Sequence, residues 1–148
     1  MQEIAVYKET IIGETKYVIF TINDENFGID ISFVNSIIKM PAITNVPDYP
    51  EHYSGIISLR GEVIPVINLR KMMNYEEEVV DSAKIIIVDI EEDKQVGIIV
   101  DEVTEVLDLS DDEIMEPSPF LKKSESLISG VGKKDDELIS VFNLESLN

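Results

Sequence analysis

An internal repeat constrains the fold of this chain more than any other feature. Residues 17–40 align with residues 84–109, so that Phe27-Gly28 falls on Val96-Gly97. Further on, "VIPVINL" (63–69) aligns with "LISVFNL" (138–144) at a constant offset of 75 residues. A chain that carries the same pattern twice is expected to fold into two similar units.

Each half of the repeat holds five short runs rich in Ile and Val, with no sustained helical period. These runs are the candidate strands 17–22, 27–31, 34–39, 55–59 and 63–68, then 84–90, 95–100, 103–108, 128–132 and 138–143. Five short antiparallel strands close into a small barrel, because closure removes exposed edges. The sequence therefore predicts an all-β fold of two five-stranded antiparallel barrels, mainly within residues 15–75 and 82–145. Short helices are expected between the halves and at the C-terminus.

The strands carry more apolar surface than a barrel interior needs. Runs such as "KIIIVDI" (84–90) place branched side chains on both faces of a strand. Either the second barrel covers the outer face through a shared apolar seam, or other proteins bind there. For the protein as a whole both can hold.

Composition narrows the class of partner. The 148 residues are 44% hydrophobic and 28% charged, which is typical of a globular protein, and no continuous apolar span of about 20 residues is present. Cys is absent, and the net charge of −18 disfavours nucleic acid and anionic lipid surfaces. The polar N-terminus has no signal-peptide pattern, so we expect a cytoplasmic protein.

Motifs for catalysis or metal binding are weak. The single histidine, His52, gives no metal cluster and makes a serine-histidine-aspartate triad improbable. The stretch "GVGKK" (130–134) lacks the spacing of a phosphate-binding loop, and Asp111-Asp112-Glu113 after Ser110 is best explained as the cap of a short turn. We predict no enzyme, no metal and no cofactor; a small β-barrel enzyme or ligand carrier stays an alternative that needs convergent polar groups in a pocket.

The repeat also serves as an internal control. Residues shared by both halves, such as Gly55 and Gly130, are explained as needs of the barrel, whereas residues that differ are freer to carry function. At the offset of 75, Leu59-Arg60-Gly61 falls on Lys134-Asp135-Asp136. Taken alone, Arg60 is a solvated turn residue; the asymmetry raises it to a candidate for partner contact.

These stretches resemble the CheW-like domain family of chemotaxis coupling proteins. The resemblance runs from Tyr17 onward, and the pattern G-x-x-x-L-R-G-x-x-x-P-V-x-x-L-R at residues 55–70 carries most of it. It implies a single CheW-like domain over residues 1–148, with two SH3-like barrels. It also implies a non-catalytic adaptor that couples the cytoplasmic tips of methyl-accepting chemoreceptors to the regulatory domain of the histidine kinase CheA, recruited to membrane-associated receptor arrays.

The resemblance implies a receptor-binding groove between the barrels, but it places no kinase-contact residues. The groove residues are Val34, Ser36, Ile37, Gly55, Leu59, Arg60, Gly61, Ile86 and Val106. Where the family usually has Glu, this chain has Ser36, so the expected acidic contact is missing. A CheW-like regulatory module of a larger signalling protein is the alternative; Met1 and the end of the chain soon after the last strand favour a free-standing protein.

Overall fold

Strands dominate the computed structural model, which describes residues 13–76, 78, 80–116 and 127–147. In the first half of the chain the strands are β1 (Glu14–Ile22), β2 (Glu25–Asp30), β3 (Val34–Lys39), β4 (Tyr53–Leu59) and β5 (Glu62–Asn68). In the second half they are β6 (Lys84–Glu91), β7 (Lys94–Val100), β8 (Glu102–Ser110), β9 (Ile114–Met115), β10 (Ile128–Lys134) and β11 (Glu137–Phe142). Short helical turns lie between them: α1 (Leu69–Met72), and the 3₁₀ helices η2 (Ile31–Phe33), η3 (Asp111–Glu113) and η4 (Leu144–Leu147).

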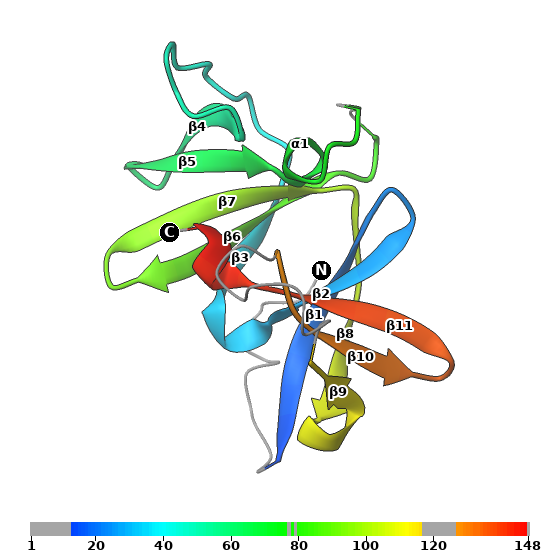
Figure 1. Ribbon diagram of the computed structural model, residues 1–148. Helices are drawn as coiled ribbons and strands as arrows, with labels where there is room; N and C mark the ends of the chain where they lie inside the picture. The colour runs from blue at the N-terminus through cyan, green and yellow to red at the C-terminus, as the bar shows by residue number, and fades with distance from the viewer. Residues whose placement is uncertain (1–12, 77, 79, 117–126, 148) are drawn as a thin grey trace.

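The strands form two sheets that lie against each other (Figure 1). The six-stranded sheet has the order β8-β1-β2-β11-β10-β9, and the five-stranded sheet has the order β3-β6-β7-β5-β4. Each order ends in two edges, so the barrels are open. The predicted all-β, SH3-like fold class is confirmed.

The division of strands between the sheets corrects the expectation of one barrel in each half of the chain. The first two strands of each half, β1-β2 and β6-β7, lie in the sheet that holds the other three strands of the opposite half. If the five predicted strands of each half are numbered one to five, both sheets have the same strand order: third, first, second, fifth and fourth. The boundaries 15–75 and 82–145 therefore mark the repeat and not the sheets, because apolar alternation fixes which face of a strand is buried but not which distant strand it joins.

Exchange of the hairpins also introduces one parallel pair into each sheet, where only antiparallel pairs were expected. β11 runs parallel to β2, and β5 runs parallel to β7. Antiparallel pairing is enforced where a tight turn joins two strands, and neither of these pairs is joined in that way. The other ladders are antiparallel.

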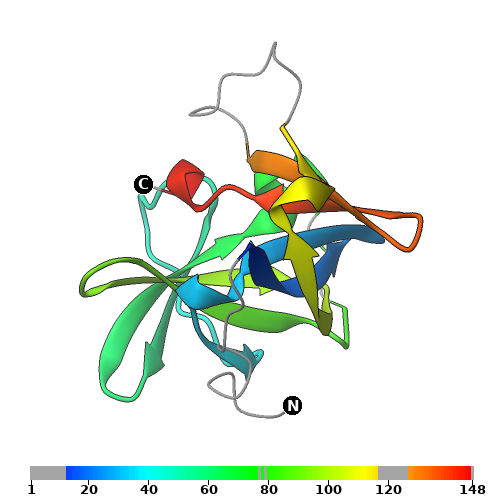
Figure 2. The same ribbon diagram turned by 90° about the horizontal axis from the view of Figure 1, so that it is seen from below.

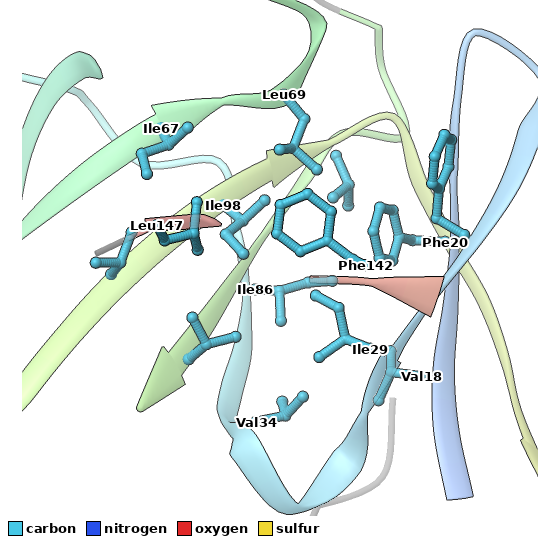
Figure 3. Close-up of a cluster of buried hydrophobic side chains, with 14 of the residues drawn as sticks. Val18, Phe20, Ile29, Val34, Ile67, Leu69, Ile86, Ile98, Phe142 and Leu147 are labelled. Carbon is cyan, nitrogen blue, oxygen red and sulfur yellow. The ribbon is translucent and has the colours of Figure 1, made fainter. Parts of the chain in front are cut away.

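Three apolar clusters form the interior, and the largest lies between the two sheets (Figure 3). This seam core takes residues from both sheets, among them Phe20, Ile29, Ile86 and Phe142. Smaller clusters line the inner face of each sheet: the six-strand core contains Leu109, and the five-strand core contains residues such as Ile57 and Ile85. The shared apolar seam proposed from the sequence is therefore present.

All ten predicted strands are present, with ends that shift by a few residues. The predicted helical segments are found in α1 and η4. The sequence missed β9, whose two residues pair with β10. Its counterpart in the first half is a single bridge between Thr44 and Ile56, which is too short to leave a pattern.

The equivalent hairpins β4-β5 and β10-β11 point to opposite ends of the molecule in both views (Figures 1 and 2). Each belongs to a different sheet. Their turns are therefore far apart and meet different surroundings, although their backbones are alike.

Candidate protein-interaction surface

The turn between β4 and β5 is a two-residue loop made of Arg60 and Gly61, with φ angles of 52° and 81°. Positive φ at both central residues is the pattern of the turn type that best matches the twist of a hairpin. The equivalent loop in the second half, Asp135-Asp136, has φ angles of 51° and 66°. The two turns thus share one backbone conformation and differ in side chains.

Arg60 adopts this conformation at a cost. The left-handed region costs a residue with a long side chain about 1 kcal/mol, whereas Asn and Asp tolerate it better. The side chain is exposed and, within the described part of the chain, takes part in no ion pair. An exposed, unpaired Arg in a strained turn adds nothing evident to the stability of the fold.

The two glycines of this hairpin have different roles. Gly55 has a φ of +142°, and a Cβ atom there would lie 2.1 Å from the carbonyl oxygen of Thr44. Thr44 crosses the β4 edge and exchanges two hydrogen bonds of 2.9 Å with Ile56. Gly55 is therefore needed by the fold because a larger residue would clash. Gly61 has open space around it, so only its positive φ angle favours glycine there.

Four of the predicted groove residues belong to the seam core or pack against it. Val34 and Ile86 are fully buried, at 0% exposure, and Ile37 lies directly opposite Ile86 in the β3-β6 ladder. Val106 on β8 is the repeat equivalent of Ile37 and is likewise partly buried against the seam core. Only Ile37 and Val106 of this group present side-chain surface to a partner.

The other predicted residues lie on a different part of the molecule. Ser36 pairs with Ile87, a member of the five-strand core, so it faces the interior of that sheet rather than the seam. Leu59 packs on the same core from the end of β4. The structure thus places the nine residues in four locations: the seam, the inner face of the five-stranded sheet, the Arg60-Gly61 turn, and, for Gly55, the point on β4 that Thr44 crosses.

The departure at Ser36 has a structural counterpart. Its Oγ atom is buried and has no hydrogen-bond partner, the one such side-chain atom found among the described residues. A buried polar group without a partner costs free energy that an apolar group of the same size does not. A carboxylate in this inward position would have the same problem in stronger form.

Sequence reasoning missed a buried ion pair. Arg70, at 8% exposure, donates from Nε to Asp101 at 2.8 Å and from Nη2 to the second carboxylate oxygen at 2.6 Å. Arg70 appeared in the family pattern, and Asp101 follows an apolar strand, but nothing in the sequence joins two residues 31 positions apart. The backbone amide of Asn23 donates to the same carboxylate at 2.8 Å.

The ion pair shifts the pKa values of Arg70 and Asp101 in the directions that favour their charged forms. Burial by itself would raise the pKa of Asp101, but hydrogen bonds from Arg70 and from the Asn23 amide outweigh it, so that pKa lies below its ordinary value. The hydrogen bond to Asp101 is the main reason that the pKa of Arg70 is raised. Both groups stay ionised at neutral pH.

Exposed apolar side chains mark both hairpins. Val63 on β5 is 67% exposed and Leu138, its repeat equivalent on β11, is 59% exposed. Val63 follows the Arg60 turn by three positions and stands opposite Ser58. The β4-β5 hairpin therefore presents Val63 beside a cationic turn, whereas in the β10-β11 hairpin Leu138 stands opposite Lys133 and beside the acidic turn Asp135-Asp136.

Other sequence predictions can be located as well. The cap predicted at Ser110 is confirmed, since Glu113 accepts hydrogen bonds from the Ser110 amide at 2.9 Å and from its hydroxyl at 3.0 Å. These bonds lower the pKa of Glu113. His52 is exposed in the loop before β4. Within the described ranges, no cluster of His, Cys, Asp or Glu could hold a metal ion, and no helix has the length and hydropathy to cross a membrane.

Comparison with known proteins agrees with this architecture. The CheW-like domain model matches residues 16–148. The chain is 34% identical to the chemotaxis protein CheW of Bacillus subtilis, over 89% of this chain and 85% of that protein. It is 30% identical to CheW of Thermotoga maritima, over 92% of this chain and 89% of that protein.

A solved structure supports the same conclusion. The scaffolding protein TtCheW from Thermoanaerobacter tengcongensis superposes with a TM-score of 0.81 at 34% identity, covering 93% of this chain and 88% of that one. The fold defines an all-β protein of two SH3-like sheets, with exposed cationic and aliphatic side chains on its hairpins. The chain belongs to the CheW-like domain family.

Proposed function

We propose that this chain is a non-catalytic chemotaxis adaptor that couples chemoreceptor cytoplasmic tips to the regulatory domain of the histidine kinase CheA. It works in the cytoplasm, at membrane-associated receptor arrays. Family membership supports the chemotaxis role. The observation that carries the receptor contact is Arg60, which is exposed and unpaired in a strained turn whose twin is Asp135-Asp136.

Receptor binding uses the end of the β4-β5 hairpin and the partly exposed rim of the seam. A receptor tip is a helical hairpin, and an amphipathic helix binds by placing apolar side chains against an apolar surface. Ile37 and Val106 supply such surface at the seam, and Val63 supplies it beside the turn. Arg60 hydrogen-bonds a carboxylate or the C-terminal carbonyls of the helix, which fixes its register.

Burial of Val34 and Ile86 restricts how those two residues act. Each is completely covered by the seam core, so neither touches a receptor in this arrangement. They support the rim residues from beneath. Substitution at either position is therefore expected to change receptor binding through loss of packing and stability.

Transplanting the twin turn tests the proposal. The variant Arg60→Asp/Gly61→Asp carries the loop of the second half, whose φ angles of 51° and 66° closely match the 52° and 81° of the first. Because the fold already accepts this loop, the variant is expected to fold. Its affinity for a receptor cytoplasmic fragment, measured by calorimetry, should fall at least about tenfold, as for loss of a charge-assisted contact.

Two controls accompany the transplant. Arg60→Lys keeps the charge but not the planar fork, so its affinity should lie between those of wild type and the transplanted variant. The reciprocal variant Asp135→Arg/Asp136→Gly should bind the fragment as wild type does. Unchanged affinity in the Arg60→Asp/Gly61→Asp variant would remove Arg60 from the receptor contact, and failure of the wild type to bind receptor fragment and CheA regulatory domain would overturn the adaptor function.

A further inference from the structure

The buried ion pair lies where the chain passes from one sheet to the other. β7 of the five-stranded sheet ends at Val100, β8 of the six-stranded sheet begins at Glu102, and Asp101 stands between them. Arg70 reaches it from α1, the helical turn that follows β5. The pair therefore bridges an element of the five-stranded sheet and the point of crossing.

Three further hydrogen bonds converge on the same residue. The Asp101 carboxylate accepts from the Asn23 amide in the β1-β2 turn, and the Asp101 amide donates to the Thr21 carbonyl of β1 at 3.0 Å. The Ser82 hydroxyl, in the connector between the halves, donates to the Asp101 carbonyl at 2.7 Å. Both sheets and the connector are thus tied to one residue.

The second crossing, from β2 to β3, shows that the fold does not need an ion pair at such a point. Ser32 stands at the repeat equivalent of Asp101, and Glu145 at that of Arg70. Here Asp30 caps η2 through a hydrogen bond from the Ser32 amide at 2.9 Å. Among the described residues neither Ser32 nor Glu145 takes part in an ion pair.

We propose that Arg70 and Asp101 form an inter-sheet clamp that sets the relative orientation of the two sheets, and with it the receptor-contact rim. This inference rests on the proposed function for its binding consequence. The hydrophobic driving force in the seam core is non-directional, so burial of apolar surface specifies the angle between the sheets less sharply than a directional contact does. A bidentate arginine-carboxylate pair is directional, and buried ion pairs are better attested as devices of registry than of stability.

The receptor-contact rim has residues on both sheets, so the clamp fixes their positions relative to each other. Ile37 lies on the five-stranded sheet and Val106 on the six-stranded sheet. A helix that contacts both residues depends on their mutual position, and a small change of sheet angle alters that position. Arg70 and Asp101 are then positioning residues for receptor binding, without contacting the receptor.

The test is the variant Arg70→Met/Asp101→Asn, which removes both charges and keeps an acceptor for the Asn23 amide. The chain offers a matched control, Lys16→Met/Asp108→Asn, because Lys16 and Asp108 form an ion pair of 2.9 Å within the six-stranded sheet. Residual dipolar couplings of the free proteins report the orientation of each sheet, and amide exchange reports the bonds at Asn23 and Asp101.

In the wild type and in the control, one alignment tensor should fit both sheets with the same relative orientation. In the clamp variant the relative orientation should change, exchange at the Asn23 amide should accelerate, and affinity for the receptor fragment should fall about fivefold. If the double variant does not fold, Arg70→Lys is the milder substitution to test, because it keeps one charge-assisted contact to Asp101.

A folded clamp variant in which the two sheets keep their wild-type relative orientation would overturn the clamp, as would the same change of orientation in the control. Wild type that fails to bind the receptor fragment would contradict the proposed function instead. The orientation measurement on the free protein decides the clamp in either case.

Discussion

The hairpins β4-β5 and β10-β11 have nearly the same backbone and different side chains. Both turns place two residues at positive φ, and both hairpins have a glycine at the point where another segment crosses their first strand, Gly55 and Gly130. The turn residues, by contrast, are Arg60-Gly61 in one hairpin and Asp135-Asp136 in the other. What the halves share is what the fold needs, and what they do not share is available for function.

The segments that follow these hairpins extend the comparison. Asn68 and Asn143 both cap the helical turn after the last strand of their half: each accepts from the amide two residues on, at 3.0 Å and 3.1 Å. The next side chains differ, with Arg70 in one half and Glu145 in the other. The asparagine cap occurs in both halves, so we attribute it to a requirement of the fold. The Arg70-Asp101 ion pair has no counterpart at the equivalent positions of the repeat, so it is an added feature.

The largest expected effect comes from the shared glycines. Gly55→Ala should destabilise the fold by more than about 3 kcal/mol, because the new Cβ would meet a backbone carbonyl at a positive φ. Gly130→Ala should cost about 1–2 kcal/mol, since its Cβ would meet the Ile114 side chain at 2.9 Å, which can shift, and the Met115 carbonyl oxygen only at 3.2 Å. Urea unfolding of both variants measures the difference, and equal costs would contradict the close approach of Thr44.

The second effect concerns the ion pair. Asp101→Asn removes the bidentate partner of the buried Arg70 and leaves, among the described residues, only the exposed Glu78 carboxylate, 3.7 Å from Nη1, so it should cost about 3 kcal/mol at pH 7. Glu145→Gln, at the equivalent position of Arg70, should leave stability unchanged. Because the folded pKa of Asp101 is lowered, its contribution is present above the unfolded carboxyl pKa of about 3.9 and is lost as pH falls through the folded value. The stability difference between wild type and Asp101→Asn should therefore shrink below about pH 4. A stability difference between wild type and Asp101→Asn that stays constant from about pH 7 to about pH 2 would contradict a stabilising Asp101 carboxylate.

A smaller effect is expected at Ser36. Removing its buried, unpartnered hydroxyl in Ser36→Ala should raise the free energy of unfolding by up to about 1 kcal/mol. Glu105, the repeat equivalent on β8, is exposed, and Glu105→Ala should change stability by less than about 0.5 kcal/mol. Loss of stability in Ser36→Ala would mean that the hydroxyl has a partner.

The smallest expected effect is that of the exchanged turns. Arg60→Asp/Gly61→Asp places two residues that tolerate positive φ in the loop. The free energy of unfolding, measured by thermal unfolding, should therefore change by no more than about 0.5 kcal/mol in either direction. The Asp135→Arg/Asp136→Gly exchange should be equally mild. A large loss of stability in the first variant alone would show that Arg60 supports the fold, which would weaken its role as a contact residue.

Much of the fold could be predicted because it depends on local pattern. Alternation of apolar residues located ten of the eleven strands, and polar or glycine-containing pairs located the turns. Pairing between distant strands could not be predicted, because β1-β2 satisfies the same alternation beside the strands of either half. The candidate site divides in the same way: Arg60 was identified as exposed and asymmetric, but Val34 and Ile86 proved to be core residues once the sheets exchanged hairpins.

By itself the sequence determined that this protein is an all-β repeat with an unusual cation in one turn, since strand patterns, turn residues and internal asymmetry are local properties of the chain. The tertiary structure alone decided that the two halves interlock, that an apolar seam covers Val34 and Ile86, and that Arg70 meets Asp101 beside Asn23. Those outcomes depend on contacts between residues far apart in the chain. Several pairings satisfy the same local pattern, and the packing of the whole molecule selects among them.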